Sequence, residues 1–138
     1  MLSRAAIWIA ALWWGSLSTV GFYVVPLLFA HLPSPALAGN MAAKLFSAQT
    51  WAALGCGLVL LLIDRSNQDP AQSQQARKAI VFVMAGMLFA LVSELVIAPH
   101  IVERDNLRLW HSLGVLFYAL QWVSSGLVFR ALLAQRSG

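Results

Sequence analysis

One acidic side chain lies inside a long apolar run of this sequence, and it is the residue best placed to do chemistry. Glu94 is the only charged residue between positions 79 and 98. A charge at the centre of a lipid bilayer costs about 2.5–3.5 kcal/mol, so an acid there needs a partner or a use. His111 lies about five residues into the next apolar run, and an antiparallel hairpin would bring it to the depth of Glu94. We therefore expect a Glu94–His111 contact, in which each group lowers the desolvation cost of the other.

The three histidines form a second group that could do chemistry. His31, His100 and His111 are all expected at one end of the helices, opposite the chain termini. Together with Glu94 they could hold zinc or copper through three nitrogens and one oxygen, or one of them could be an axial ligand to haem. The spacing is not a metal motif, because no helix carries two histidines four residues apart and Cys56 is the only cysteine. The alternative is structural, with His31 and His100 in interfacial turns. His111 would then bond Glu94 or a backbone carbonyl.

Polar and small residues recur at spacings of three and four along the apolar runs. Residues at this spacing share one helix face, and small ones let membrane helices approach closely enough to hydrogen-bond. One interpretation is close helix packing. The other is a narrow polar cavity that opens outward, toward the histidine end. The residues expected to bound this cavity are Thr19, Tyr23, Gln49, Glu94, His111, Tyr118 and Gln121.

The composition indicates what kind of protein must position these side chains. Of the 138 residues, 60% are hydrophobic and 10% are charged, against about 45–50% and about 25% in soluble proteins. This excludes an ordinary soluble globule and a disordered chain. The net charge is +4, but the cations lie at the ends of apolar runs rather than on a basic face with interleaved aromatic residues. No nucleic-acid partner is therefore expected, and the lipid bilayer is.

Four apolar runs are each long enough to cross a bilayer as a helix. Pro35 and Pro70 are expected in the first turns of the second and third helices. Pro99 is expected to end the third helix at Ala98, because a proline disfavours the helical conformation for the residue before it. The four expected helices span about 5–30, 35–63, 70–98 and 106–134. We predict an all-α, integral membrane four-helix bundle, made of two antiparallel hairpins in a single domain over residues 1–138.

The distribution of Lys and Arg predicts the orientation of this bundle in the membrane. Six cations are expected on the side of the termini, namely Arg4, Arg65, Arg77, Lys78, Arg130 and Arg136. Three are expected on the opposite side, namely Lys44, Arg104 and Arg108. Because Lys and Arg are enriched in cytoplasmic loops, we expect both termini and the loop over residues 64–78 in the cytoplasm. The expected location is the inner (plasma) membrane of the cell.

The two expected hairpins resemble each other. Each has a proline near the end of its first helix and a histidine close behind, Pro26 with His31 and Pro99 with His100. An internal duplication would leave this pattern.

Several short strings carry a resemblance over nearly the whole chain. They are Val25-Pro26-Leu27-Leu28-Phe29, Ala38-Gly39 with Leu45-Phe46, Ala98-Pro99-His100-Ile101, and Leu109-Trp110-His111-Ser112. With these strings the chain resembles the transmembrane protein 205-like family, which in bacteria is a domain of unknown function. The resemblance implies a four-helix integral membrane protein and implies no activity. The chain departs from the family pattern after His111, where it has Ser112-Leu113-Gly114.

Two classes of function remain open from the sequence. The first is a non-enzymatic membrane module, either an accessory subunit or a small binding or transport protein, built around the outward polar cluster and working as a homo-oligomer or in a larger membrane complex. The second is a membrane oxidoreductase that binds haem or a metal such as copper or zinc through His31, His100 or His111. No phosphate-binding loop or nucleophile elbow favours soluble-enzyme chemistry.

Overall fold

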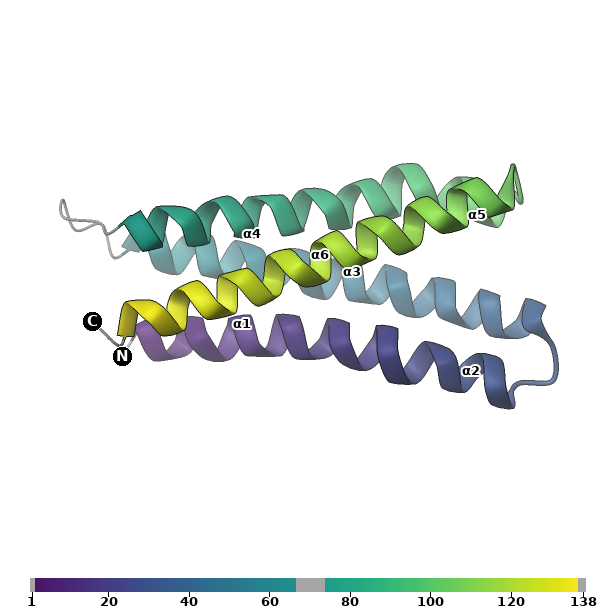
Figure 1. The fold of residues 1–138 in the computed structure, drawn as a ribbon, viewed down its shortest axis with the longest axis horizontal. Coiled ribbons are helices and arrows are strands. Elements are labelled where there is room, and N and C mark those ends of the chain that lie inside the picture. Colours follow the sequence, from purple (N-terminus) through teal and green to yellow (C-terminus); the bar gives the residue numbers. More distant parts are fainter. Residues whose placement is uncertain (1, 67–73, 137–138) are drawn as a thin grey trace.

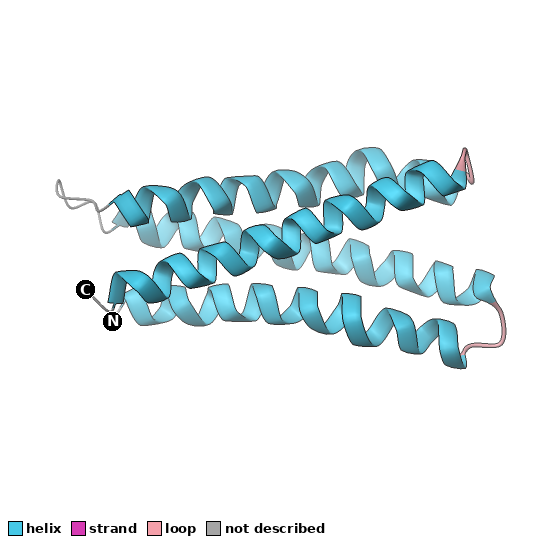
Figure 2. Cartoon of the chain, viewed as in Figure 1, coloured by secondary structure: helices cyan, strands magenta, loops and turns pink. Residues whose placement is uncertain are grey.

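Helices account for nearly all of the chain described by the computed structural model, which covers residues 2–66 and 74–136. Four of them are long and apolar enough to cross a membrane, over Arg4–His31, Pro35–Ser66, Ala76–Val102 and Leu107–Gln135. These described residues contain no strand (Figure 2). The prediction of an all-α chain with four apolar spans is therefore confirmed. The expected start of the third helix at Pro70 lies outside the described residues.

The first and third spans are each built from three helical pieces, whereas the second and fourth are single helices. The pieces are α1 (Leu2–Thr19), η1 (Val20–Val24) and α2 (Val25–His31), then α4 (Gln74–Val92), η2 (Ser93–Ile97) and α5 (Ala98–Val102). The single helices are α3 (Pro35–Ser66) and α6 (Leu107–Arg136). Both η1 and η2 are π-helical turns, which are wider than the α-helix on either side.

The helices pack side by side with their long axes along the molecule (Figure 1). The long first pieces of the first and third spans, α1 and α4, each contact both α3 and α6. The start of α1 and the end of α6 lie at the same end of the bundle, together with the start of α4 (Figure 1). We call this the terminal end. The opposite end, where α2 and α5 lie, is called the histidine end.

One residue separates each π turn from a proline. The N–H of Val25 donates to the carbonyl of Val20, and the N–H of Ala98 donates to the carbonyl of Ser93, so both bonds span five residues. The next residue is Pro26 in one case and Pro99 in the other. A proline has no N–H and its ring clashes with the carbonyl four residues earlier. We attribute the widening of both turns to this clash.

The third span ends later than predicted. Its helix continues through Pro99 and ends at Val102 instead of at Ala98. The expectation was wrong because the preceding π turn absorbs the steric conflict that would otherwise end the helix at a proline.

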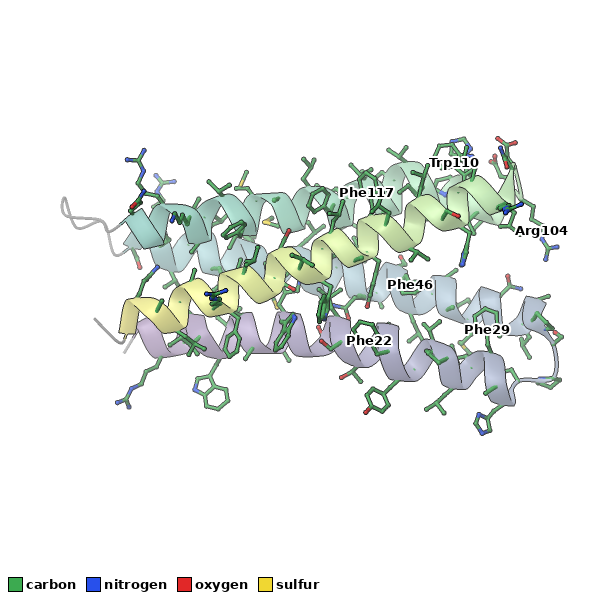
Figure 3. All side chains as sticks on the ribbon, viewed as in Figure 1. Phe22, Phe29, Phe46, Arg104, Trp110 and Phe117 are labelled. Carbon is green, nitrogen blue, oxygen red and sulfur yellow. The ribbon has the colours of Figure 1, made fainter. Side chains whose placement is uncertain are left out.

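The core of the bundle is built from small residues around one large ring. Trp13 of α1 is fully buried and reaches across to Gly86 of α4, where a Cβ atom would lie 2.9 Å from the indole. Ala10, Ala53 and Ala90 are also fully buried. Large apolar side chains instead cover the outside of the bundle (Figure 3). This is the inverse of a soluble core and fits a surface that faces lipid.

Candidate functional site

Glu94 lies in the π turn η2 and is bonded to the neighbouring helix α3. The hydroxyl of Ser47 donates a hydrogen bond to Glu94 Oε1 over 2.6 Å. This is the distance range of a charge-assisted bond between a hydroxyl and a carboxylate, about 2.5–2.7 Å. Both side chains are half-buried. The only acid predicted inside a span therefore has a hydroxyl partner on another helix.

The expected Glu94–His111 contact does not form. Among the described residues, no hydrogen bond or ion pair joins the two side chains, and His111 is exposed. Trp110 of α6 stacks on His100, and Gly114 of α6 lies beside Ile97 and Ile101. Residues 97–101 are therefore level with residues 110–114, and Glu94 lies deeper in the bundle than His111. The two side chains are not at equal depth, which was the basis of the expected contact.

Two other members of the expected cluster connect α1 to its neighbours. Gln49 is buried, and its Nε2 donates to Ser16 Oγ over 2.9 Å. The Tyr118 hydroxyl donates to the carbonyl of Leu17 over 2.7 Å. A hydrogen bond between membrane helices contributes about 0.6 kcal/mol on average and up to about 1.7 kcal/mol. These two residues therefore support close helix packing, one of the two interpretations left open by the sequence.

The remaining cluster residues point in different directions. Thr19 is exposed and bonds the carbonyl of Gly15 in its own helix, while the Tyr23 side chain is 70% exposed. Gln121 is only 3% exposed, and its Nε2 has no hydrogen-bond partner among the described residues. The structure does not bring the seven expected residues together around one cavity.

Sequence reasoning missed Ser47, although a signal for it was present. Ser47 and Glu94 lie 23 and 24 residues from Pro70, the centre of the polar segment between the second and third spans. In an antiparallel hairpin, residues at equal distances from the turn lie at equal depth. Ser47 could therefore have been found by searching α3 for a donor at the depth of Glu94. The serines that bond across from α1, Ser16 to Gln49 and Ser18 to Trp122, were also missed as partners.

The structure corrects the metal hypothesis. Within residues 2–66 and 74–136, no three His, Cys, Asp or Glu side chains come together as metal ligands. His31 Nδ1 donates to the carbonyl of Leu27 over 3.0 Å. The ring of His100 stacks on Trp110 with centroids 3.9 Å apart, and its Nδ1 lies 3.6 Å from an Asp105 oxygen. Local contacts therefore hold His31 and His100. A metal-binding site made of these two residues with His111 and Glu94 is not supported.

Four apolar spans and an outer surface of large apolar side chains define a multi-pass helical membrane protein. A family model described as a domain of unknown function (DUF4149) matches residues 8–109, which is more than two thirds of the chain, and the chain belongs to this family. The matched region includes both π turns and the Ser47–Glu94 pair. Comparison with curated proteins found no match, and comparison with solved structures found none either.

Proposed function

We propose that the protein is a small binding module of the inner (plasma) membrane, and that Glu94 is the centre of its binding site. The observation that carries this proposal is the incomplete set of partners of Glu94. A carboxylate has about four acceptor positions, and Ser47 is its one hydrogen-bond donor among the described residues. The free positions can accept a proton or a hydrogen-bond donor of a ligand.

The location of Glu94 supports the same proposal. A charge inside a membrane span is expensive unless it is compensated, so Glu94 must hold a proton or face a positively charged or strongly donating group. It lies in a π turn, and single π turns inside α-helices occur frequently at functional sites. We also propose that the chain is related to the transmembrane protein 205-like family. The short sequence strings given above support this more specific assignment.

Infrared difference spectroscopy of the protein in nanodiscs tests whether Glu94 exchanges a proton. The difference between spectra in acidic and alkaline buffer contains a carboxylic acid band for each acid that takes up a proton, and Glu94→Gln should remove one of these bands. Ser47→Ala should shift this band, because Ser47 donates to the same carboxyl group. Glu103→Gln is the matched control, since Glu103 is exposed and lies after α5. Identical difference spectra for the wild type and Glu94→Gln would contradict the proposal.

The proposed orientation places both termini and the loop over residues 64–78 in the cytoplasm. It is supported by the six cations at the terminal end against three at the other end. Reporter fusions after residue 138 and within the loop should both report a cytoplasmic location. An external location for either fusion would contradict this part of the proposal.

A second candidate function is that of a subunit that associates laterally with another copy of the chain through α3. A specific observation favours it: Ala48, Ala52 and Gly55 are exposed on α3, and no atom lies within 4 Å of a Cβ built at Gly55. Small residues at this spacing allow close approach of another membrane helix.

Cysteine cross-linking in native membranes tests this second candidate. Ala52→Cys in a Cys56→Ala background should give a cross-linked dimer. Val115→Cys, exposed on α6, is the control and should not. Equal cross-linking from both positions, or none from Ala52→Cys, would exclude association through α3.

A further inference from the structure

An open groove lies at the terminal end of α4, at least 12 residues before Glu94 in the same membrane span. It has a volume of about 540 Å³, and its described lining consists of Gln74, Arg77, Lys78, Val81 and Phe82. All five of these residues belong to one face of α4. Nitrogen-bearing side chains are visible around this end of α4 in Figure 3.

The lining residues change from polar to apolar along the helix axis. Gln74, Arg77 and Lys78 occupy the first turns of α4, and Val81 follows on the same face. Val81 and Phe82 lie about 6 Å deeper along the helix than the two cations, at 1.5 Å per residue. The third membrane span begins at Ala76, and the side chain of Val81 is 63% exposed. The cations therefore lie at the level of lipid headgroups, and the apolar part of the groove lies where acyl chains begin.

Within residues 2–66 and 74–136, no acid is paired with the two cations of the groove. Neither Arg77 nor Lys78 forms an ion pair with another described residue, and both side chains are exposed. Further exposed cations lie at the same end of the bundle, on α1, α3 and α6: Arg4, Arg65 and Arg130. An occupant of the groove should therefore carry an anionic group above an apolar part.

We propose that this groove binds one anionic phospholipid. The guanidinium of Arg77 suits two parallel hydrogen bonds to the phosphate oxygens, and the Lys78 ammonium adds a second positive charge. The Gln74 amide supplies a donor and an acceptor for the remainder of the headgroup. One acyl chain lies along Val81 and Phe82. Basic pockets at the ends of membrane helices bind anionic headgroups in the same manner. The site does not involve Glu94 and is independent of the function proposed above.

Lipid titration of the full-length protein in neutral detergent tests the proposal. Native mass spectrometry counts bound phosphatidylglycerol for the wild type, for Arg77→Gln/Lys78→Gln, and for Arg4→Gln/Arg130→Gln. The third protein is matched, because it loses two exposed cations from the same end but outside the groove. Loss of Arg77 and Lys78 should weaken binding about thirtyfold, from the usual contribution of each cation near an anionic surface. The matched variant should bind as tightly as the wild type. Equal weakening of both variants would overturn the proposal, since attraction to the whole basic end would then explain binding.

The anionic group could come from a lipid or from a soluble phosphate, and further arms of the same experiment distinguish them. Phosphatidylglycerol should raise the midpoint temperature of wild-type unfolding, and glycerophosphoglycerol, the same headgroup without acyl chains, should not. Inorganic phosphate and zwitterionic phosphatidylcholine should also have no effect. An equal shift from inorganic phosphate or from the free headgroup would identify a soluble anion site and overturn the lipid assignment. An equal shift from phosphatidylcholine would show that charge is not recognised, which would overturn it as well.

Discussion

The two π turns of the bundle have the same backbone and different surroundings. Both span five residues, and in both a single residue separates the turn from a proline. In the first, η1, no residue is buried, and the ring of Tyr118 from α6 lies against Gly21. In the second, η2, Ile97 is buried and Glu94 is bonded to Ser47 of α3. The first turn is thus held by an aromatic ring of another helix, whereas the second carries the acid.

On the function proposed above, this difference is one between a structural use of a proline and a use in binding. A proline in a membrane helix leaves the carbonyl four residues earlier without its usual donor, and neighbouring helices or local π adjustments compensate for it. In η1 the widened turn is packed by Tyr118 and carries no ionisable group except the exposed Tyr23. In η2 a π turn of the same length carries Glu94, whose carboxyl group has free acceptor positions. If the function proposed above is correct, the first turn stabilises the fold and the second carries the binding site.

Gly21→Ala should produce the largest loss of stability and sharpen this comparison. A Cβ at residue 21 would lie 2.6 Å from Tyr118 Cε1, so the ring must move and its hydrogen bond to Leu17 must lengthen. Overpacking of this kind costs roughly 1–3 kcal/mol. Thermal unfolding in detergent measures the effect as a lower midpoint temperature.

Gly15→Ala is the matched control for this substitution. Gly15 is also in the first span, but no atom lies within 4 Å of a Cβ built there. It should be neutral or stabilising by up to about 1 kcal/mol, because alanine is a better helix former than glycine. If both variants lose the same stability, Tyr118 does not hold the first π turn.

A double-mutant cycle between Glu94 and Ser47 should give the next largest effect. Glu94→Leu, Ser47→Ala and the double variant should show a coupling of about 0.6–1.7 kcal/mol, because each single change removes the hydrogen bond between the two helices. The corresponding cycle of Glu94→Leu with His111→Leu should show a coupling near zero. Unfolding midpoints in detergent measure both cycles. The reverse result, with strong coupling only to His111, would assign Glu94 a different partner and remove the contrast between the two turns.

The helix positions of this fold could be predicted from the sequence because hydropathy and length fix where a chain crosses a bilayer. The second span starts at Pro35 as expected, and the fourth starts at Leu107, one residue later than expected. Capping residues and prolines mark these helix starts well, whereas Pro99 does not mark a helix end. The third span continues to Val102, so Glu94 lies deeper in the bundle than His111 and the depth predicted from Pro99 was wrong.

The π turns explain part of what failed in the site, namely the position of Tyr23. One additional residue in a turn rotates everything after it by about 100° relative to a regular α-helix. Helical spacing placed Thr19 and Tyr23 on the face of the expected cavity, but Tyr23 lies in η1 and is exposed. That Glu94 needs a partner could be anticipated, since the cost of a charge inside a span does not depend on helix rotation. Its partner Ser47 required the geometry of the hairpin.

Removal of single hydroxyl groups should have the smallest effect on stability. It compares Tyr118, which contacts η1 from α6, with Tyr23, which lies inside η1. Tyr118→Phe deletes the donor to the Leu17 carbonyl and keeps the ring that packs on Gly21, so it should destabilise by about 0.5–1 kcal/mol. Tyr23→Phe deletes a hydroxyl from a side chain that is 70% exposed, and it should change the unfolding midpoint little. In the Gly21→Ala background the effect of Tyr118→Phe should shrink, because the displaced ring no longer reaches Leu17. Additive effects of Gly21→Ala and Tyr118→Phe would contradict this, because they would mean that ring packing and the hydrogen bond stabilise the first π turn independently of each other.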